Sequence, residues 1–193
     1  MENTLEQEYK QAKRKSAKPM LWVSMISMTM LFAGLTSAYV VSRNRGDWVS
    51  FDLPPAFYTS TILIIISSIT FMLAKFFIKK DNRQFTTLFL ASTLILGVGF
   101  VYFQFEGFKE LINSGLFFAG EKSTVKSSFI YGITLAHLAH IAAGLIVLLV
   151  VFYNHLTKKY TSLNFLGLEL GAIFWHFVDI LWIYLFLFFY FIR

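Results

Sequence analysis

Long apolar stretches alternate with short polar segments along the whole chain. Five of them are long enough to cross a membrane as helices, because a helix rises about 1.5 Å per residue and the hydrocarbon core is about 30 Å thick. We predict these helices at about residues 20–41, 57–78, 85–105, 129–153 and 166–191. The pattern predicts an all-α fold, an integral membrane bundle of five transmembrane helices. We expect one transmembrane domain over residues 1–193, in which residues 1–19 form a basic tail.

The composition agrees with a membrane protein. Hydrophobic residues make up 56% of the 193 residues and charged residues 15%, whereas soluble domains are about a quarter charged. The chain has no Cys, which excludes disulfides, thiolate metal sites and a Cys nucleophile. The net charge of +6 comes from basic residues at the ends of the apolar stretches. We therefore assign this charge to contact with anionic lipid and expect no nucleic-acid partner.

The distribution of Lys and Arg predicts how the bundle is oriented. Eleven of the 17 basic residues lie in the N-terminal tail and in or beside the second and fourth connections, and six lie on the other side of the membrane. Basic residues are enriched in cytoplasmic segments. The count therefore predicts a cytoplasmic N-terminus and a C-terminus outside.

Five ionisable residues interrupt the last two apolar stretches: His137, His140, Glu169, His176 and Asp179. Such a residue costs about 2.5–3.5 kcal/mol on insertion scales and marks a candidate functional site. Helical rise places His140 and His176 at similar depths, and likewise His137 and Asp179. We therefore expect a buried polar cluster between the two helices, with contacts within each of these pairs.

Several roles are open for this cluster. The residues can satisfy one another as a structural unit, or they can serve a lipid headgroup, a proton or a partner subunit. Candidates for headgroup contact are Arg43, His140 and His176. A metal or haem site is a further alternative because the HxxH spacing of His137 and His140 offers ligands, but no ligand set is complete. We predict no metal site and no catalytic residue in this chain.

Three segments match the pattern of one membrane-protein family. The segment "LGLELGAIFWHFVDILWIYLFLFFYF", residues 166–191, resembles the last helix of subunit III of haem-copper cytochrome c oxidases. The segment "HLAHIAAG", residues 137–144, resembles the preceding helix of that subunit. "LFAGLTSAYVVSR", residues 31–43, resembles an earlier one. The chain is similar to the short, five-helix bacterial type.

Two positions depart from the family pattern. Many members carry a buried carboxylate five residues before the Ala-Gly pair, and this chain has Met28 there. The Gln-x-x-Glu of the third helix is also altered, because Gln104 is followed by Glu106, with Gly107 in the expected Glu position. The role of the missing carboxylate cannot be transferred to this chain.

The resemblance implies an accessory subunit III of a proton-pumping terminal oxidase, a complex that oxidises cytochrome c with oxygen. Such a subunit holds no redox centre and is not catalytic by itself. It stabilises the catalytic subunit, binds structural phospholipid and supports proton uptake. The implied partners are catalytic subunit I, other oxidase subunits that hold haem and copper, phospholipids and a respiratory supercomplex. The implied location is the bacterial cytoplasmic (inner) membrane, crossed several times.

Other functions remain open from the sequence. Within the same family, the chain would also fit the accessory subunit found beside nitric oxide reductases. A small proton-coupled transporter would use the His and Asp residues as a proton relay. A membrane haem protein would use the histidines as ligands. Copurification with a haem-bearing subunit, transport by the isolated chain and a haem spectrum of the chain alone would separate these functions.

Overall fold

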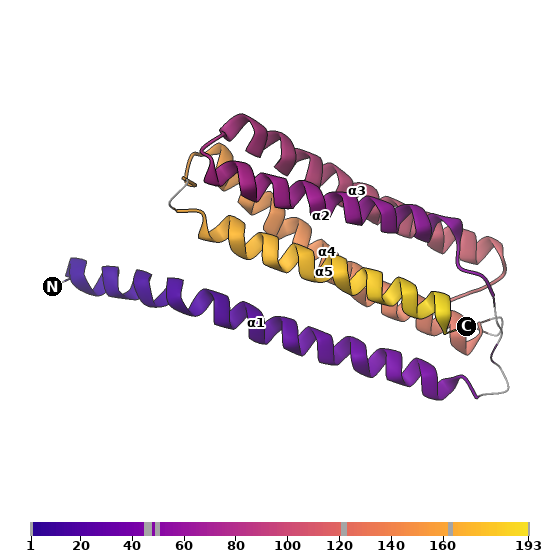
Figure 1. The fold of residues 1–193 in the computed structure, drawn as a ribbon. Helices are drawn as coiled ribbons and strands as arrows, with labels where there is room; N and C mark the ends of the chain where they lie inside the picture. Colours follow the sequence, from indigo (N-terminus) through magenta and orange to yellow (C-terminus); the bar gives the residue numbers. More distant parts are fainter. Residues whose placement is uncertain (1, 45–47, 49–50, 121–122, 162–163, 193) are drawn as a thin grey trace.

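Helices account for nearly all of the described structure. The computed structural model describes residues 2–44, 48, 51–120, 123–161 and 164–192. Five helices follow one another in these residues (Figure 1): α1 (Glu2–Ser42), α2 (Pro55–Lys79), α3 (Arg83–Asn113), α4 (Val125–Leu156) and α5 (Leu166–Phe191). Between them the described residues form two isolated β-bridges and no strand. All five helices are long and apolar enough to cross a membrane, which confirms the predicted fold class.

Every predicted span lies inside an observed helix, and for α5 the bounds coincide. The largest differences lie at the start of α1 and the end of α3. Helix α1 begins at Glu2, so most of the segment predicted as a tail is helical and Pro19 lies within the helix. Helix α3 continues to Asn113, because Phe108 and Leu111 extend its apolar packing beyond the predicted span.

Local signals in the sequence account for several helix ends. Pro55 occupies the first turn of α2, where no intrahelical backbone donor is needed. The side chain of Asn82 accepts a hydrogen bond from the backbone N–H of Phe85 at the start of α3. Thr124 and Ser127 form a reciprocal capping box at the start of α4. These caps satisfy backbone donors that the first turn of a helix leaves without partners.

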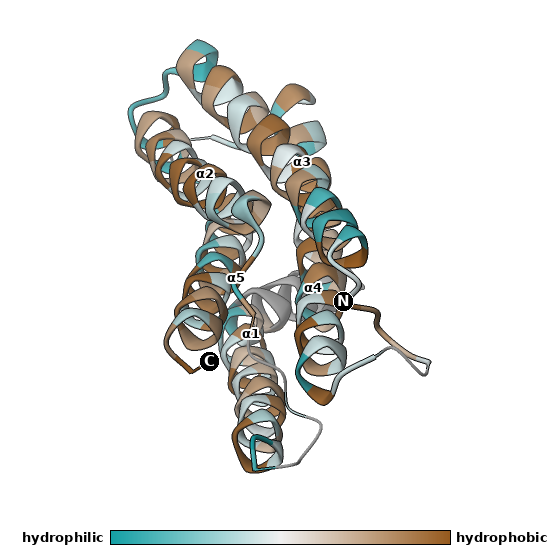
Figure 2. Ribbon diagram, turned by 90° about the vertical axis from the view of Figure 1, so that its right-hand side faces the viewer, coloured by the Kyte–Doolittle hydropathy of each residue, from teal (hydrophilic) through white to brown (hydrophobic). Residues whose placement is uncertain are grey.

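Helices α4 and α5 lie in the middle of the bundle. Figure 2 shows the pair of α2 and α3 on one side of them and α1 on the other. Within the described part of the chain, α1 contacts α4 and α5 but neither α2 nor α3. In the most apolar part of α5, 44% of the residues are buried, against 17% for α1. Helix α1 is therefore a peripheral helix attached to a four-helix unit.

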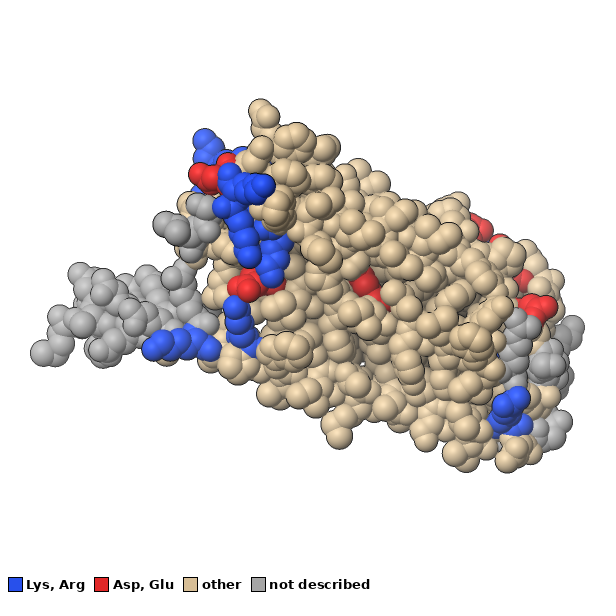
Figure 3. Space-filling model, viewed as in Figure 1, with Lys and Arg blue, Asp and Glu red and all other residues tan. Residues whose placement is uncertain are grey.

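Charged side chains lie mainly at the two ends of the bundle. Figure 3 shows Lys and Arg gathered at the end that carries the N-terminus, with a largely uncharged surface along the middle. We call this end the basic end; it carries the turn between α2 and α3 and the loop between α4 and α5. The C-terminus lies at the opposite end (Figure 1).

Candidate functional site

A row of polar contacts joins α2 to α5 through the interior of the bundle. The indole N–H of Trp175 donates to Ser67 Oγ over 3.0 Å, and that of Trp182 donates to Thr61 Oγ1 over 3.0 Å. Between them, Ser68 Oγ and Nδ1 of His176 are 2.6 Å apart. We call this row the α2–α5 seam; it consists of Thr61, Ser67, Ser68, Trp175, His176, Asp179 and Trp182. The seam places small hydroxyl side chains of α2 against the large polar side chains of α5.

Asp179 is the least satisfied member of the seam. Its side chain is 1% exposed, and neither carboxyl oxygen has a hydrogen-bond partner among the described residues. Ser68 lies beside the carboxyl group without reaching hydrogen-bond geometry. A buried polar group without a partner is rare and costly, so this position calls for a functional explanation.

Helix α3 adds two polar contacts on the other side of α2. The amide Nε2 of Gln104 donates to Ser60 Oγ over 3.0 Å, and the hydroxyls of Thr70 and Thr93 are 2.8 Å apart. Ser60, Thr93 and Gln104 are fully buried. Side-chain hydrogen bonds therefore fix α2 to both of its neighbours, which suits helix packing in an apolar solvent.

Glu169 lies apart from the other four cluster residues, at the basic end of α5. Its carboxylate is 2.9 Å from Nζ of Lys18 on α1 and 3.9 Å from Nζ of Lys75 on α2. These ion pairs join three helices at one end of the bundle. They explain how α5 tolerates an acidic residue in its first turn.

His137 and His140 lie on α4, away from the seam residues of α2. The ring of His137 is fully buried among aromatic rings, 5.2 Å from Trp182 and 6.1 Å from Phe100, and its two nitrogens have no partner among the described residues. Nδ1 of His140 is 2.7 Å from the carbonyl oxygen of Ala136 in its own helix. The ring of His140 lies edge-on to Phe32 of α1 at 5.6 Å.

No hydrogen bond joins His140 to His176 or His137 to Asp179 among the residues that the structure describes. His176 bonds to Ser68, and both His137 and Asp179 are without a hydrogen-bond partner there. The physical reason lies in how α4 and α5 meet. A Cβ atom added to Gly144 of α4 would come within 3.2 Å of the Trp175 ring, so a tryptophan fills the contact between these helices. His176 and Asp179 then face α2.

The three candidates for headgroup contact do not meet at one site. Arg43 follows α1 near the end opposite to the basic end. His140 packs on Phe32. Phe32 lies eleven residues before Arg43 in the chain, a separation of about 16 Å along the helix. His176 faces α2 on the far side of α5. One lipid headgroup cannot contact all three.

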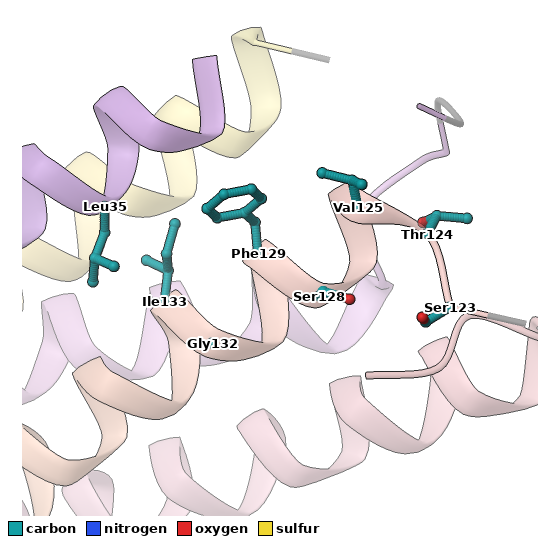
Figure 4. A pocket seen from close by; sticks show the side chains of 8 residues that line it. All are labelled: Leu35, Ser123, Thr124, Val125, Ser128, Phe129, Gly132 and Ile133. Carbon is teal, nitrogen blue, oxygen red and sulfur yellow. The ribbon is translucent and has the colours of Figure 1, made fainter. Parts of the chain in front are cut away.

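Apolar clefts flank α1 where it lies against α4 and α5. One of them, of about 590 Å³, is near the basic end and is lined by residues such as Leu21, Val147 and Leu170, with Ser24, Asn154 and Tyr160 as polar members. A second, of about 320 Å³, lies between α1 and the start of α4 (Figure 4). A third, of about 270 Å³, lies between α1 and α5.

Polar contacts hold α1 to α5 at both ends of these clefts. At the basic end, Lys18 pairs with Glu169. Towards the opposite end, the hydroxyl groups of Thr36 and Tyr184 are 3.2 Å apart, and the Tyr39 hydroxyl donates to the carbonyl oxygen of Ile192 over 3.1 Å. Tyr39 itself is fully buried. Helix α1 is thus fixed at two points with apolar clefts between them.

Met28 occupies an apolar position on α1. Its side chain packs against both of the buried hydrophobic clusters that form the core. Within the residues that the structure describes, no three His, Cys, Asp or Glu side chains gather into a group that could hold a metal ion. The apolar packing of Met28 suits its thioether.

One buried charge was missed from the sequence. Lys126 is only 1% exposed; its Nζ donates to the carbonyl oxygen of Phe51 over 3.2 Å and lies 4.4 Å from the centre of the Phe51 ring. From the sequence, we counted Lys126 only among the basic residues that lie between the predicted helices. Lys126 lies two residues after Thr124, whose capping pattern marks the start of α4. This position puts Lys126 in the first turn of α4, beside the connection between α1 and α2.

Comparison with known proteins finds one matching family and several similar chains. The family described as "Cytochrome c oxidase subunit III" matches residues 50–193, which include α2 to α5. The chain is 27% identical over 172 residues to "Cytochrome c oxidase subunit 3" of Alkalihalophilus pseudofirmus, covering 86% of this chain and 81% of the relative. It is 28% identical over 173 residues to the protein of the same name from Bacillus subtilis, covering 86% and 81%. It is 30% identical over 174 residues to "Cytochrome bo(3) ubiquinol oxidase subunit 3" of Buchnera aphidicola subsp. Baizongia pistaciae, covering 88% of each chain.

Proposed function

Because the chain belongs to the cytochrome c oxidase subunit III family, we propose that it is an accessory subunit of a proton-pumping haem-copper terminal oxidase. The observation that carries this proposal is the family match over residues 50–193, the whole four-helix unit that α1 joins. Subunits of this family lack redox centres. The chemistry of the complex, oxidation of an electron donor by oxygen, belongs to partner subunits that hold haem and copper.

The internal contacts support a role as a rigid support for the catalytic subunit I. The buried polar groups of α2 are hydrogen-bonded inside this chain, through the α2–α5 seam and through the contacts with Gln104 and Thr93. Long apolar surfaces remain on the outside, such as Ile62, Ile69 and Met72 on α2. Lipid tails and the apolar helices of a partner subunit both suit these surfaces.

The electron donor is a property of the partner subunits. The named relatives divide between cytochrome c oxidases and ubiquinol oxidases, so both complexes use this kind of subunit. We propose cytochrome c as the donor, in line with the family to which the chain belongs. Oxygen consumption by the purified complex with either reduced cytochrome c or a quinol distinguishes the two.

Structural phospholipid fits the clefts beside α1. The cleft near the basic end has apolar walls that suit an acyl chain, and Asn154 and Tyr160 offer polar groups to a headgroup. Polar contacts at both ends of α1 keep the helix in place while the clefts between them stay open. We propose that phospholipid fills this space in the assembled complex and helps to hold α1 in place.

The location and orientation that we propose rest on the family and on the distribution of charges. Five helices able to cross a membrane and relatives from bacteria indicate a multi-pass bacterial membrane protein. We place it in the cytoplasmic (inner) membrane with the basic end in the cytoplasm, following the distribution of Lys and Arg. The accessory subunit then supports proton uptake from the cytoplasmic side. A supercomplex with other respiratory enzymes is a further expectation.

Affinity purification through a tag on this chain tests the proposal. We expect a haem-bearing subunit to copurify, and the complex to consume oxygen. Deleting the gene should leave a catalytic subunit that still reduces oxygen but loses activity faster during turnover. A chain that purifies without any haem-bearing partner would overturn the proposed function.

A further inference from the structure

Two polar pairs lie in line along the facing surfaces of α2 and α5, one in the seam and one at the basic end, with two helical turns between them. Ser68 and Lys75 are seven residues apart on α2, and Glu169 and His176 are seven apart on α5, so each pair shares one face over two turns. The two faces meet, because Ser68 Oγ is 2.6 Å from His176 and Lys75 Nζ is 3.9 Å from Glu169. Lys75 is also close enough to His176 for their charges to interact.

Asp179 lies at the inner limit of this line. Its buried carboxyl group has no hydrogen-bond partner among the described residues, and Ser68 lies beside it. The helices packed against α5 bring few other charges to this depth. They are the two histidines His137 and His140 on α4. The nearest charge on α2 is Lys75, seven residues from Ser68 toward the basic end, and α1 has no Lys, Arg, His, Asp or Glu between Lys18 and Arg43. Asp179 therefore has no opposite charge in contact with it.

We propose that Asp179, Ser68 and His176 form a buried site that holds one proton and exchanges it with the basic end of the bundle. An unpaired carboxylate is strongly disfavoured in an apolar interior, so Asp179 carries the proton at rest. Ser68 bonds to His176 and lies beside Asp179, so its hydroxyl passes a proton between them once a small side-chain movement brings the Asp179 carboxyl group within hydrogen-bond distance. His176 is half-buried, and its Nε2 atom is not among the enclosed atoms.

The transfer moves one proton and changes no other bond. The Asp179 O–H gives its proton to Ser68 Oγ while Ser68 gives its own hydroxyl proton to Nδ1 of His176. The products are the carboxylate, an intact serine and an imidazolium. The imidazolium then releases a proton from Nε2, and loading follows the same steps in reverse. The inference rests on the proposed function for its purpose, because a terminal oxidase consumes protons.

Infrared spectroscopy of the purified complex tests this site. A protonated carboxyl group has a separate C=O band that shifts when its proton is replaced by deuterium. We expect Asp179→Asn to remove one such band and Asp179→Glu to keep it at a changed position. Ser68→Ala should slow deuterium exchange of the band roughly a hundredfold, the scale of losing a positioned proton-transfer group.

The neighbouring serine is a matched control. Ser67→Ala removes the bond to Trp175 but leaves Ser68, His176 and Asp179 in place, so the exchange rate should stay unchanged. Equal exchange rates in the two serine variants would overturn the proposal. A spectrum unaffected by Asp179→Asn would do so too. If that variant does not assemble, the serine pair and Asp179→Glu decide the question. Copurification of haem is scored separately, so a failure of the accessory-subunit assignment is recognised independently.

Discussion

Nζ of Lys18 and the carboxylate of Glu169 lie 2.9 Å apart and join the basic end of the first helix to the first turn of the last. This ion pair ties α1 to the four-helix unit at the basic end. Its two residues lie close in sequence to Leu21 and Leu170, which line the cleft of about 590 Å³. Its strength therefore bears on how far α1 can move away from the four-helix unit.

We predict that Glu169→Gln lets the basic end of α1 move outward with little loss of stability. Both side chains are partly exposed, and such pairs contribute about 0–1 kcal/mol to the free energy of unfolding. The chain has no Cys, so Ser24→Cys and Val150→Cys can place spin labels across the cleft. The distance between the labels should lengthen or broaden. Lys80→Met is the control, and an equal change in that variant would contradict the prediction.

Thr61→Val should destabilise the chain by about 1–3 kcal/mol. Valine has the same shape but leaves the buried indole N–H of Trp182 without an acceptor. Unfolding in detergent, followed by tryptophan fluorescence, measures the loss. Thr59→Val on the exposed side of α2 is the matched control and should change stability by less than about 0.5 kcal/mol. Equal losses of stability in both variants would show that this hydrogen bond does not stabilise the chain.

Gly97→Ala should also destabilise the bundle, by about 1–3 kcal/mol. A Cβ atom at Gly97 would lie 2.8 Å from the Trp175 ring and 2.9 Å from Leu145, so these side chains would have to shift. At Gly99, two positions along the same helix, the nearest atom is at 3.6 Å, an ordinary contact. Gly99→Ala should therefore be tolerated in the same unfolding measurement. A Gly97→Ala chain as stable as the Gly99→Ala chain would show that the interior adjusts freely.

Carbodiimide should label Asp179 and should not label α1 between Met20 and Val41. The reagent reacts with protonated carboxyl groups in apolar surroundings, and that part of α1 contains no acidic residue. Glu169 is less reactive because Lys18 and Lys75 stabilise its carboxylate. Peptide mass spectrometry locates the adduct, and Asp179→Asn should abolish it. An adduct between Met20 and Val41 would be incompatible with Met28 standing in place of the usual carboxylate.

The sequence was sufficient to predict the number, type and approximate limits of the helices. Membrane thickness sets the length of an apolar stretch, and for α5 the predicted bounds were the observed ones. The ring contact of His137 with Trp182, one turn from Asp179, is compatible with the similar depths that helical rise predicts for His137 and Asp179. Such reasoning fixes how deep a residue lies in the membrane.

The direction in which each polar residue points could not be predicted in the same way. It depends on which neighbour packs against each face, and adjacent residues of a helix point about 100° apart. Trp175 fills the contact with α4, so His176 turns toward Ser68 on α2. Lys126 was missed for a related reason, because its burial depends on Phe51 in a distant connection. Both outcomes depend on tertiary packing.

The peripheral position of α1 has a consequence for how the protein is made. Of the five helices, α1 leaves the ribosome before the others, whereas its helix partners α4 and α5 are synthesised after α2 and α3. More than eighty residues separate the end of α1 from the start of α4, on the order of 5–15 s of translation at about 5–20 residues per second. During that interval the newly inserted helix has no partner within its own chain. Until α4 and α5 are inserted, α1 therefore lies in the membrane without the helices against which it packs.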